Sequence, residues 1–269
     1  MNKFLIFLLI LLTSCSQSST NKRKALINDL NLNKFNKNTY SVNFFNIFSL
    51  EKITNNKRLV IYIEGDGFSW VDRFTISSDP TPTDPVAFKL ALMDKNENVI
   101  YLARPCQYEW SDTCNKEIWT ISQYSSVVLK SYNEIISHLS KTYKEIHLVG
   151  YSGGAGIAMY LGSTNNSSIK SIRTIAGNIN HNELSKILEI SRLRKSINFY
   201  TIEKKITEIP QIHYYGLEDK TVPNLLQTSY KKRNSNNNCV KIKAVGNASH
   251  GKGWLNYWKI NNPIIPDCN

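Results

Sequence analysis

The sequence predicts an α/β domain in which a mainly parallel central sheet is flanked by helices. Two observations carry this prediction. Short apolar runs rich in β-branched residues alternate with segments of helical spacing from about residue 40 onward, and such alternation favours a parallel sheet covered on both sides. The runs are continuously apolar, which is typical of strands buried on both faces.

The expected elements follow from these runs in chain order. Strands are expected at residues 41–48, 58–63, 98–103, 145–149, 169–175, 209–215 and 239–245. Helices are expected, from apolar spacing or capping residues, at 84–93, 121–139, 155–161 and 223–232. Two longer segments, 66–85 and 178–208, do not fit the alternation. We expect them to form a lid or binding loops over the strand ends.

The N-terminus carries the features of an export signal. Lys3 supplies a positive charge, and residues 4–12 form an apolar stretch that is too short to cross a bilayer. The run Leu12-Thr13-Ser14-Cys15 resembles the cleavage box of bacterial lipoproteins. The resemblance implies cleavage before Cys15, lipidation of its sulfur and acylation of its amine, with ordinary secretion as the alternative.

This interpretation divides the chain into three parts. Residues 1–14 are the expected signal peptide, residues 15–39 a flexible tether rich in Ser, Asn and Lys, and residues 40–269 a single domain. The chain would then be anchored at the cell envelope through a lipid on Cys15. In a Gram-negative host, Ser16 after the cysteine resembles the signal for the outer membrane, facing the periplasm.

The chain is strongly basic, with a formal net charge of +12. Loss of residues 1–14 removes only Lys3 and leaves +11. No aromatic-basic motif accompanies the scattered Lys and Arg, so we expect no nucleic-acid partner for an exported chain. A solvated basic surface, or attraction to an anionic membrane, accounts for the charge better. The sequence carries no signal of oligomeric state.

Four cysteines remain after Cys15, and an even number in an exported chain favours disulfides over metal ligation. Three pairings are possible. We favour Cys106–Cys114, which closes a short loop, and Cys239–Cys268, which ties the C-terminal tail to the last strand. The sequence has no C-x-x-C pair and no histidine cluster, so no metal site is expected.

The pentapeptide Gly150-Tyr151-Ser152-Gly153-Gly154 matches G-x-S-x-G and lies between an apolar run and a helical segment. In such a setting the chain leaves a strand, turns sharply and enters a helix, so the Ser152 hydroxyl stands exposed at the bend. Gly150 and Gly154 are needed where side chains would collide across the turn. The pattern predicts a nucleophilic serine.

A nucleophilic serine needs a base, and the chain has five histidines. His147 and His213 fall within expected strands, where structural roles are favoured, and His138 lies on an expected helix, where we expect it to face solvent. His181 begins the second long segment. His250 lies in a polar loop after the last expected strand, which is the position expected of the base.

The carboxylate that orients the base is expected at the end of the preceding strand. Asp219 lies between the run 209–215 and a helix, and Glu218 beside it is the alternative. Capping of that helix is the purely structural interpretation of Asp219. The order along the chain is then Ser152, Asp219, His250.

Three matches in this order carry a family resemblance. Gly150-x-Ser152-x-Gly154, the run Gly216-x-x-Asp219-x-x-Val222-Pro223 and the late His250 together resemble the α/β-hydrolase superfamily over about residues 58–255. The resemblance implies the α/β-hydrolase fold, with the insertion 178–208 after its sixth strand. Several loops, among them 104–108, also resemble those of exported bacterial members.

The resemblance further implies an oxyanion site. Gly153 should donate one N–H and the loop after an early strand the other. That loop reads Glu64-Gly65-Asp66-Gly67, with glutamate where relatives often carry histidine. By analogy Asp66 supplies the second N–H, with Gly67 as the alternative. A carboxylate there would oppose negative charge, so the Asp66 side chain should point away or hold the loop by hydrogen bonds.

Basic and aromatic residues flank these loops. Arg104 follows an expected strand, and we expect it to anchor its loop through backbone carbonyls. Trp70, Trp110 and Trp119 are expected in the core rather than in a pocket wall.

These residues together predict a serine hydrolase that cleaves a carboxylic ester or related acyl bond of a small molecule through an acyl-enzyme at the cell envelope. His250 would take the Ser152 proton and Asp219 would orient the imidazole, with no cofactor or metal. The triad does not encode the bond class. The alternatives are a non-catalytic envelope lipoprotein that uses the fold for binding, and a serine peptidase.

Overall fold

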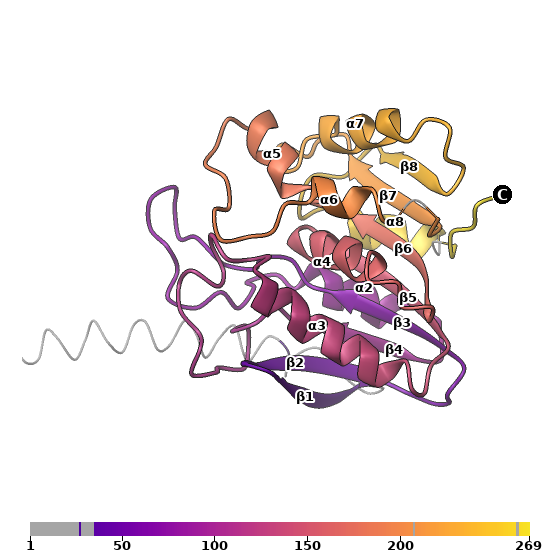
Figure 1. The fold of residues 1–269 in the computed structure, drawn as a ribbon, viewed down its shortest axis with the longest axis horizontal. Helices are drawn as coiled ribbons and strands as arrows, with labels where there is room; N and C mark the ends of the chain where they lie inside the picture. Colours follow the sequence, from indigo (N-terminus) through magenta and orange to yellow (C-terminus); the bar gives the residue numbers. More distant parts are fainter. Residues whose placement is uncertain (1–26, 28–34, 207, 262–263) are drawn as a thin grey trace, which may run out of the picture.

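The fold is built on one eight-stranded sheet, seen in a computed structural model that describes residues 27, 35–206, 208–261 and 264–269. The strand order is β1-β2-β4-β3-β5-β6-β7-β8 (Figure 1). The pairs β1–β2 and β2–β4 are antiparallel, and every other neighbouring pair is parallel. This confirms the mainly parallel sheet predicted from the apolar runs.

The elements have the following bounds. The strands are β1 (Asn36–Val42), β2 (Phe45–Lys52), β3 (Arg58–Ile63), β4 (Val99–Leu102), β5 (Glu145–Tyr151), β6 (Ile169–Ile175), β7 (Gln211–Gly216) and β8 (Val240–Val245). The helices are α2 (Val86–Met93), α3 (Ser126–Leu139), α4 (Gly153–Gly162), α5 (His181–Ile187), α6 (Tyr200–Glu203), α7 (Leu225–Arg233) and α8 (Trp254–Asn261).

Helices cover both faces of the sheet, which explains why the strands are continuously apolar. The α3, α4 and α7 helices pack on one face and α2 and α8 on the other. Ile61 and Tyr62 are neighbours in β3 and both are fully buried, but they belong to the cores on opposite sides of the sheet. Alternate side chains of a strand point to opposite faces, so a doubly covered strand has no polar face.

The strand expected at residues 41–48 is in fact the junction of two strands. Val42 of β1 pairs with Phe45 of β2 across a two-residue turn, Asn43-Phe44. Asn43 has φ of 48°, a left-handed conformation that asparagine tolerates better than most residues. The sequence did not indicate this turn because Val42, Phe45 and Ile47 around it have strong strand propensity.

The folded domain begins before the boundary expected at residue 40. The β1 strand starts at Asn36, and Phe35 is buried with its ring 6.2 Å from that of Phe88. The expected tether 15–39 is therefore too long at its C-terminal end. The expected signal peptide 1–14 and the lipidation site Cys15 lie outside the described residues.

The insertion predicted at residues 178–208 follows β6 and contains the short helices α5 and α6 joined by a loop. In Figure 1 the loop between them extends to the same side of the molecule as the long loop after β3. No helix in the described part of the chain is long and apolar enough to cross a membrane.

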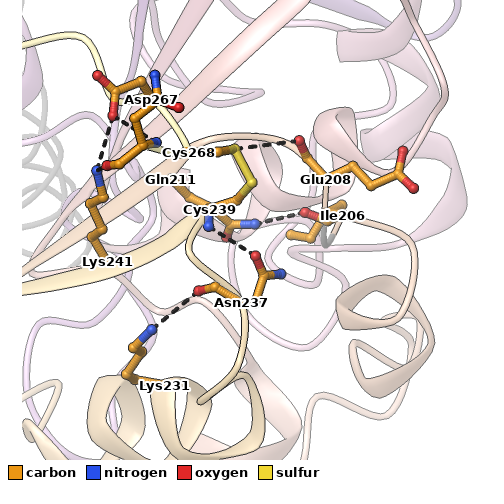
Figure 2. Close-up of a disulfide and its surroundings, with 10 residues drawn as sticks. Ile206, Glu208, Gln211, Lys231, Asn237, Cys239, Lys241, Asp267 and Cys268 are labelled. Carbon is orange, nitrogen blue, oxygen red and sulfur yellow. Dashed lines mark hydrogen bonds and ion pairs between the residues drawn. A yellow bond between two sulfur atoms is a disulfide. The ribbon is translucent and has the colours of Figure 1, made fainter.

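Both favoured disulfides are present, Cys106–Cys114 and Cys239–Cys268. The second joins the start of β8 to the C-terminal tail (Figure 2). Lys241 of β8 reinforces this attachment, since its Nζ lies 3.0 Å from Asp267 Oδ1 and 2.7 Å from the Asn269 carbonyl oxygen. The tail is thus held on the last strand by one covalent and two polar contacts.

Replacing both Cys239 and Cys268 with serine is expected to lower the free energy of unfolding by about 3 kcal/mol, because the disulfide closes a loop of 29 residues that restricts the unfolded chain. Chemical denaturation under oxidising conditions measures this loss. The matched control is Asp267→Asn, which removes an exposed ion pair and should cost less than about 1 kcal/mol. Equal losses in the two variants would contradict the prediction.

Candidate active site

Ser152 occupies the sharp turn between β5 and α4. Its φ of 49° and ψ of −120° lie in a region that side chains rarely adopt, at a cost of about 1–3 kcal/mol. The Ser152 N–H donates to the Ile175 carbonyl at 3.0 Å, which ties the turn to β6. A serine held this way has its hydroxyl outside both the strand and the helix.

Two glycines allow the turn to close. A Cβ added to Gly150 would lie 2.5 Å from Ala155 Cα, and one added to Gly154 would lie 2.2 Å from the Ile63 carbonyl oxygen. Both distances are far below contact and both obstacles are backbone. The glycines predicted from the sequence are therefore required by the packing of the turn.

A continuous hydrogen-bonded chain connects three of the predicted residues. Ser152 Oγ lies 2.9 Å from His250 Nε2, and His250 Nδ1 lies 2.9 Å from Asp219 Oδ2. The Asp219 side chain is fully buried, while that of His250 is 24% exposed. The structure thus brings together Ser152, Asp219 and His250, which are separated by 31 to 98 positions in the sequence.

The other oxygen of Asp219 fixes the carboxylate. Oδ1 accepts hydrogen bonds of 2.9 Å from the N–H groups of Thr221 and Val222. Asp219 does not cap the following helix, because α7 begins at Leu225 with Asn224 as its N-cap; its two backbone hydrogen bonds instead close the turn before that helix. Glu218, the other candidate, is exposed.

Two aromatic residues that the sequence did not single out hold the His250 loop. Tyr151 donates from its hydroxyl to the His250 carbonyl at 3.1 Å, and Trp254 Nε1 donates to the same oxygen at 3.0 Å. A Cβ on Gly216 would lie 2.2 Å from the Ala248 carbonyl oxygen, so the end of β7 also packs closely against this loop. These contacts hold the backbone that carries the imidazole.

The remaining described histidines do not reach Ser152 Oγ. His147 and His213 are buried in β5 and β7, and burial lowers the pKa of both, to about 3 for His213. His181 is buried at the start of α5, and its Nε2 donates to the Ile197 carbonyl at 2.8 Å. Burial also lowers the pKa of His181, and the side chain lines the cavity without contacting Ser152.

The loop expected to complete an oxyanion site lies directly against the serine turn. Gly153 is the first residue of α4, where N–H groups have no partner within the helix. No backbone carbonyl of a described residue accepts a hydrogen bond from Asp66 or Gly67. Both residues line the same cavity as Ser152. The arrangement leaves N–H groups of both segments available to a bound oxygen.

The Asp66 carboxylate holds this loop through an ion pair. Arg104 Nη1 lies 2.8 Å from Asp66 Oδ1, and Arg104 Nη2 donates to the Gln123 carbonyl at 2.8 Å. A Cβ on Gly153 would lie 2.0 Å from Asp66 Oδ1, so this carboxylate needs the glycine beside it. Of the two expectations for Asp66, it holds the loop rather than pointing away, and the buried guanidinium offsets its charge.

The segment closed by the Cys106–Cys114 disulfide contacts the same loop, residues 64–67, through Gln107. Gln107 follows Cys106, and its Nε2 donates to the Gly65 carbonyl at 3.1 Å. Gln107 Oε1 accepts from the Arg104 N–H at 3.0 Å. The disulfide-bonded loop therefore fixes both partners of the Asp66–Arg104 pair.

Glu64 stands where relatives often carry histidine, and it is buried. Its Oε1 accepts from the Gly65 N–H at 2.9 Å and from the Ala87 N–H at 3.4 Å. Burial raises the pKa of this carboxyl from 4.5 to about 7. Glu64 binds its proton more tightly in the folded state than in the unfolded state. The folded protein therefore loses stability as the pH rises above 4.5.

Glu64→Gln is expected to remove this pH dependence. Wild-type protein should lose about 3 kcal/mol of stability between pH 4.5 and 7 through Glu64, whereas glutamine keeps the acceptor oxygen and does not ionise. The measurement is the unfolding free energy at a series of pH values for both proteins. The control Glu218→Gln, at an exposed carboxyl, should follow the wild-type curve. A Glu64→Gln curve parallel to wild type would show that ionisation of Glu64 is not the source of the pH dependence.

A cavity of about 530 Å³ opens above Ser152 and His250. Its walls come from the loop after β3 and from the insertion, whose apolar contributors are Leu184, Leu188, Ile190 and Leu193. Trp70 also lines it and is 46% exposed, Trp110 is 53% exposed, and only Trp119 is buried. The core placement expected for the three tryptophans is therefore wrong for Trp70 and Trp110.

No group of three or more potential metal-ligating side chains occurs among the residues that the structure describes. The chemistry available at this site is that of a serine hydroxyl, an imidazole, a buried carboxylate and backbone N–H groups. This set is suited to nucleophilic attack on a carbonyl group.

The comparisons agree with this description of the fold. No protein-family model and no curated protein matches the sequence. Among solved structures, Est1E from Butyrivibrio proteoclasticus is similar with a TM-score of 0.60 at 12% identity, over 83% of this chain and 94% of that one. An esterase from Pyrococcus furiosus gives 0.59 at 13% identity over 86% and 90%. A serine hydrolase homologue from Coxiella burnetii gives 0.57 at 13% identity over 84% and 94%.

The sheet order, the serine turn and these similarities agree on one fold. The chain has the α/β-hydrolase fold, as its sequence motifs implied.

Proposed function

We propose that the protein is a serine hydrolase that cleaves a carboxylic ester or a related acyl bond through an acyl-enzyme. The observation that carries the proposal is the hydrogen-bonded chain Ser152–His250–Asp219, with both distances at 2.9 Å, at the floor of a cavity. The esterases and serine hydrolase homologue similar in structure support the same class of reaction.

The reaction follows from the geometry. Ser152 Oγ forms a bond to the carbonyl carbon while its proton passes to His250 Nε2. Asp219 accepts the His250 Nδ1 proton in a hydrogen bond, which fixes the tautomer and stabilises the charged imidazole. The N–H groups of Gly153 and Asp66 hold the oxyanion. The imidazolium then protonates the leaving alcohol as the ester bond breaks, and water repeats the sequence to release the acid.

A fluorophosphonate probe tests the proposal directly, because it forms a covalent bond only with an activated serine. Mass spectrometry of the labelled chain should find the adduct on Ser152 alone. Absence of labelling would favour a binding protein that uses the same fold. Turnover of a panel of esters, thioesters and peptide amides would then distinguish an esterase from a peptidase.

We also propose that the chain is tethered at the cell envelope by a lipid on Cys15. The apolar stretch 4–12 followed by Leu12-Thr13-Ser14-Cys15 supports this. Cys15→Ala should lower the share of the protein in the membrane fraction of a bacterial host, and an unchanged share would contradict the tether.

A further inference from the structure

A short hairpin in the loop after β3 carries large apolar side chains into solvent. Trp70 pairs with Ile76 in an isolated antiparallel bridge, and the Val71 N–H donates to the Thr75 carbonyl at 2.8 Å. At the tip, Val71 is 55% exposed and Phe74 is 86% exposed. Large apolar side chains gathered at a surface mark a site of contact with another apolar phase.

The tip has a defined shape. Asp72 Oδ1 accepts from the N–H groups of Phe74 and Thr75 at 2.8 and 2.9 Å. These hydrogen bonds lower the pKa of the exposed Asp72 carboxyl and close the turn. The hairpin therefore presents Val71 and Phe74 outward as a fixed projection.

The loop after α5 continues the same surface. Ile190 is 56% exposed, and Ile190 and Trp70 line the same cavity as Ser152. The two segments extend on one side of the molecule, the hairpin in purple and the loop after α5 in orange (Figure 1). The apolar surface thus reaches the cavity of the candidate active site through Trp70 and Ile190.

Basic side chains flank these apolar ones. Arg73 lies at the hairpin tip with its guanidinium carbon 5.8 Å from the centre of the Phe74 ring. Arg192 and Arg194 are exposed on the loop after α5. The segment 189–197 has three cations against the single carboxylate of Glu189, although Lys195 also pairs with Glu117. Apolar side chains bordered by arginine match the boundary between headgroups and acyl chains of an anionic bilayer.

We propose that the hairpin 69–77 and the loop 189–197 form a docking surface for an anionic lipid membrane, with the cavity entrance facing the bilayer. A second copy of the chain fits this surface less well, since a two-fold contact would place the arginines of one loop against those of the other. The docking itself does not require catalysis. That the substrate is a membrane lipid ester rests on the proposed hydrolase function.

Quenching of tryptophan fluorescence by brominated acyl chains tests the docking. The full chain carrying Ser152→Ala is added to vesicles of phosphatidylcholine and phosphatidylglycerol, so that no lipid is cleaved. We expect quenching that falls in Trp70→Phe and falls at least about fivefold in Val71→Ser/Phe74→Ser. Arg192→Glu/Arg194→Glu should weaken it on anionic vesicles and leave the residual quenching on pure phosphatidylcholine unchanged.

The control is Ile260→Ser, which removes a large apolar side chain that is 71% exposed on α8, away from the hairpin and the loop. Its quenching should equal that of the parent. Because every variant has the same N-terminus, any attachment through that segment is constant, and the difference in quenching between the parent and Trp70→Phe reports the docking of this face. Quenching that persists in Val71→Ser/Phe74→Ser, absence of quenching in the parent, or a dimer that shields Trp70 would overturn the proposal.

The lipid substrate is tested separately with Ser152 intact. Val71→Ser/Phe74→Ser should hydrolyse soluble p-nitrophenyl acetate at the parent rate and lose about tenfold on phosphatidylglycerol vesicles. Parallel losses on both substrates would count against docking. Failure of the parent to label with fluorophosphonate would refute the hydrolase function while leaving the vesicle measurement on Ser152→Ala valid.

Discussion

Replacing Ser152 with alanine is expected to lower kcat on p-nitrophenyl acetate by about 10⁶-fold, the scale on which serine triads fail when the nucleophile is removed. The reason is that the Ser152 hydroxyl is the only hydroxyl hydrogen-bonded to His250 Nε2 among the described residues. Alanine lacks the oxygen that would bond to the substrate carbonyl. Steady-state kinetics measures the loss, and fluorophosphonate labelling should vanish with it.

Ser185→Ala is the matched control, because Ser185 lines the same cavity but its hydroxyl donates to the His181 carbonyl at 2.8 Å instead of contacting the imidazole. Its kcat should stay within about threefold of wild type. Thermal unfolding of Ser152→Ala should show an intact fold. A well-folded Ser152→Ala protein that keeps more than a small fraction of its activity would place the nucleophile elsewhere.

The sequence was sufficient to predict that Ser152, Asp219 and His250 lie close together, because the topology brings them to one edge of the sheet. Strands β5, β7 and β8 are parallel, so the residues that follow their carboxyl ends meet at one edge of the sheet. Ser152, Asp219 and His250 each follow one of these strands. The buried apolar runs predict these strands, and the strands in turn predict that the three side chains lie near one another.

The loops and cavity walls around the site depend on contacts between segments that are distant in the sequence. A local sequence pattern does not predict such contacts. The pairing of Asp66 with Arg104 joins residues 38 positions apart, and neither sequence neighbourhood indicates the other. Trp70 resembles any buried tryptophan in a window of its neighbours, yet it lies in an exposed hairpin, paired with Ile76, and lines the cavity. Helix α8 was missed because its buried residues, Trp254 and Trp258, are too few for a clear periodic signal.

Asp219→Asn is expected to lower kcat by about 10⁴-fold while preserving the fold. The two oxygens of Asp219 have different partners, which determines how an asparagine would sit. Oδ1 accepts from the N–H groups of Thr221 and Val222, and Oδ2 faces His250 Nδ1. Only a carbonyl oxygen can accept from the two N–H groups, so the amide NH₂ of asparagine must take the place of Oδ2.

That orientation of the amide reverses the tautomer of the His250 imidazole. An NH₂ group facing Nδ1 makes Nδ1 an acceptor, so the neutral ring carries its proton on Nε2. Nε2 then donates to Ser152 Oγ and can no longer accept its proton. The loss should appear in kcat and in fluorophosphonate labelling, with little change in thermal stability because both backbone hydrogen bonds survive.

Glu218→Gln distinguishes the two carboxylates that the sequence offered. Glu218 is exposed, so its amide should leave kcat within about twofold of wild type. If Glu218→Gln lost as much activity as Asp219→Asn, the assignment of the orienting carboxylate would be wrong. If Asp219→Asn lost less than tenfold, the buried contact between Asp219 and His250 would be structural, because a tautomer that cannot accept the serine proton cannot sustain turnover.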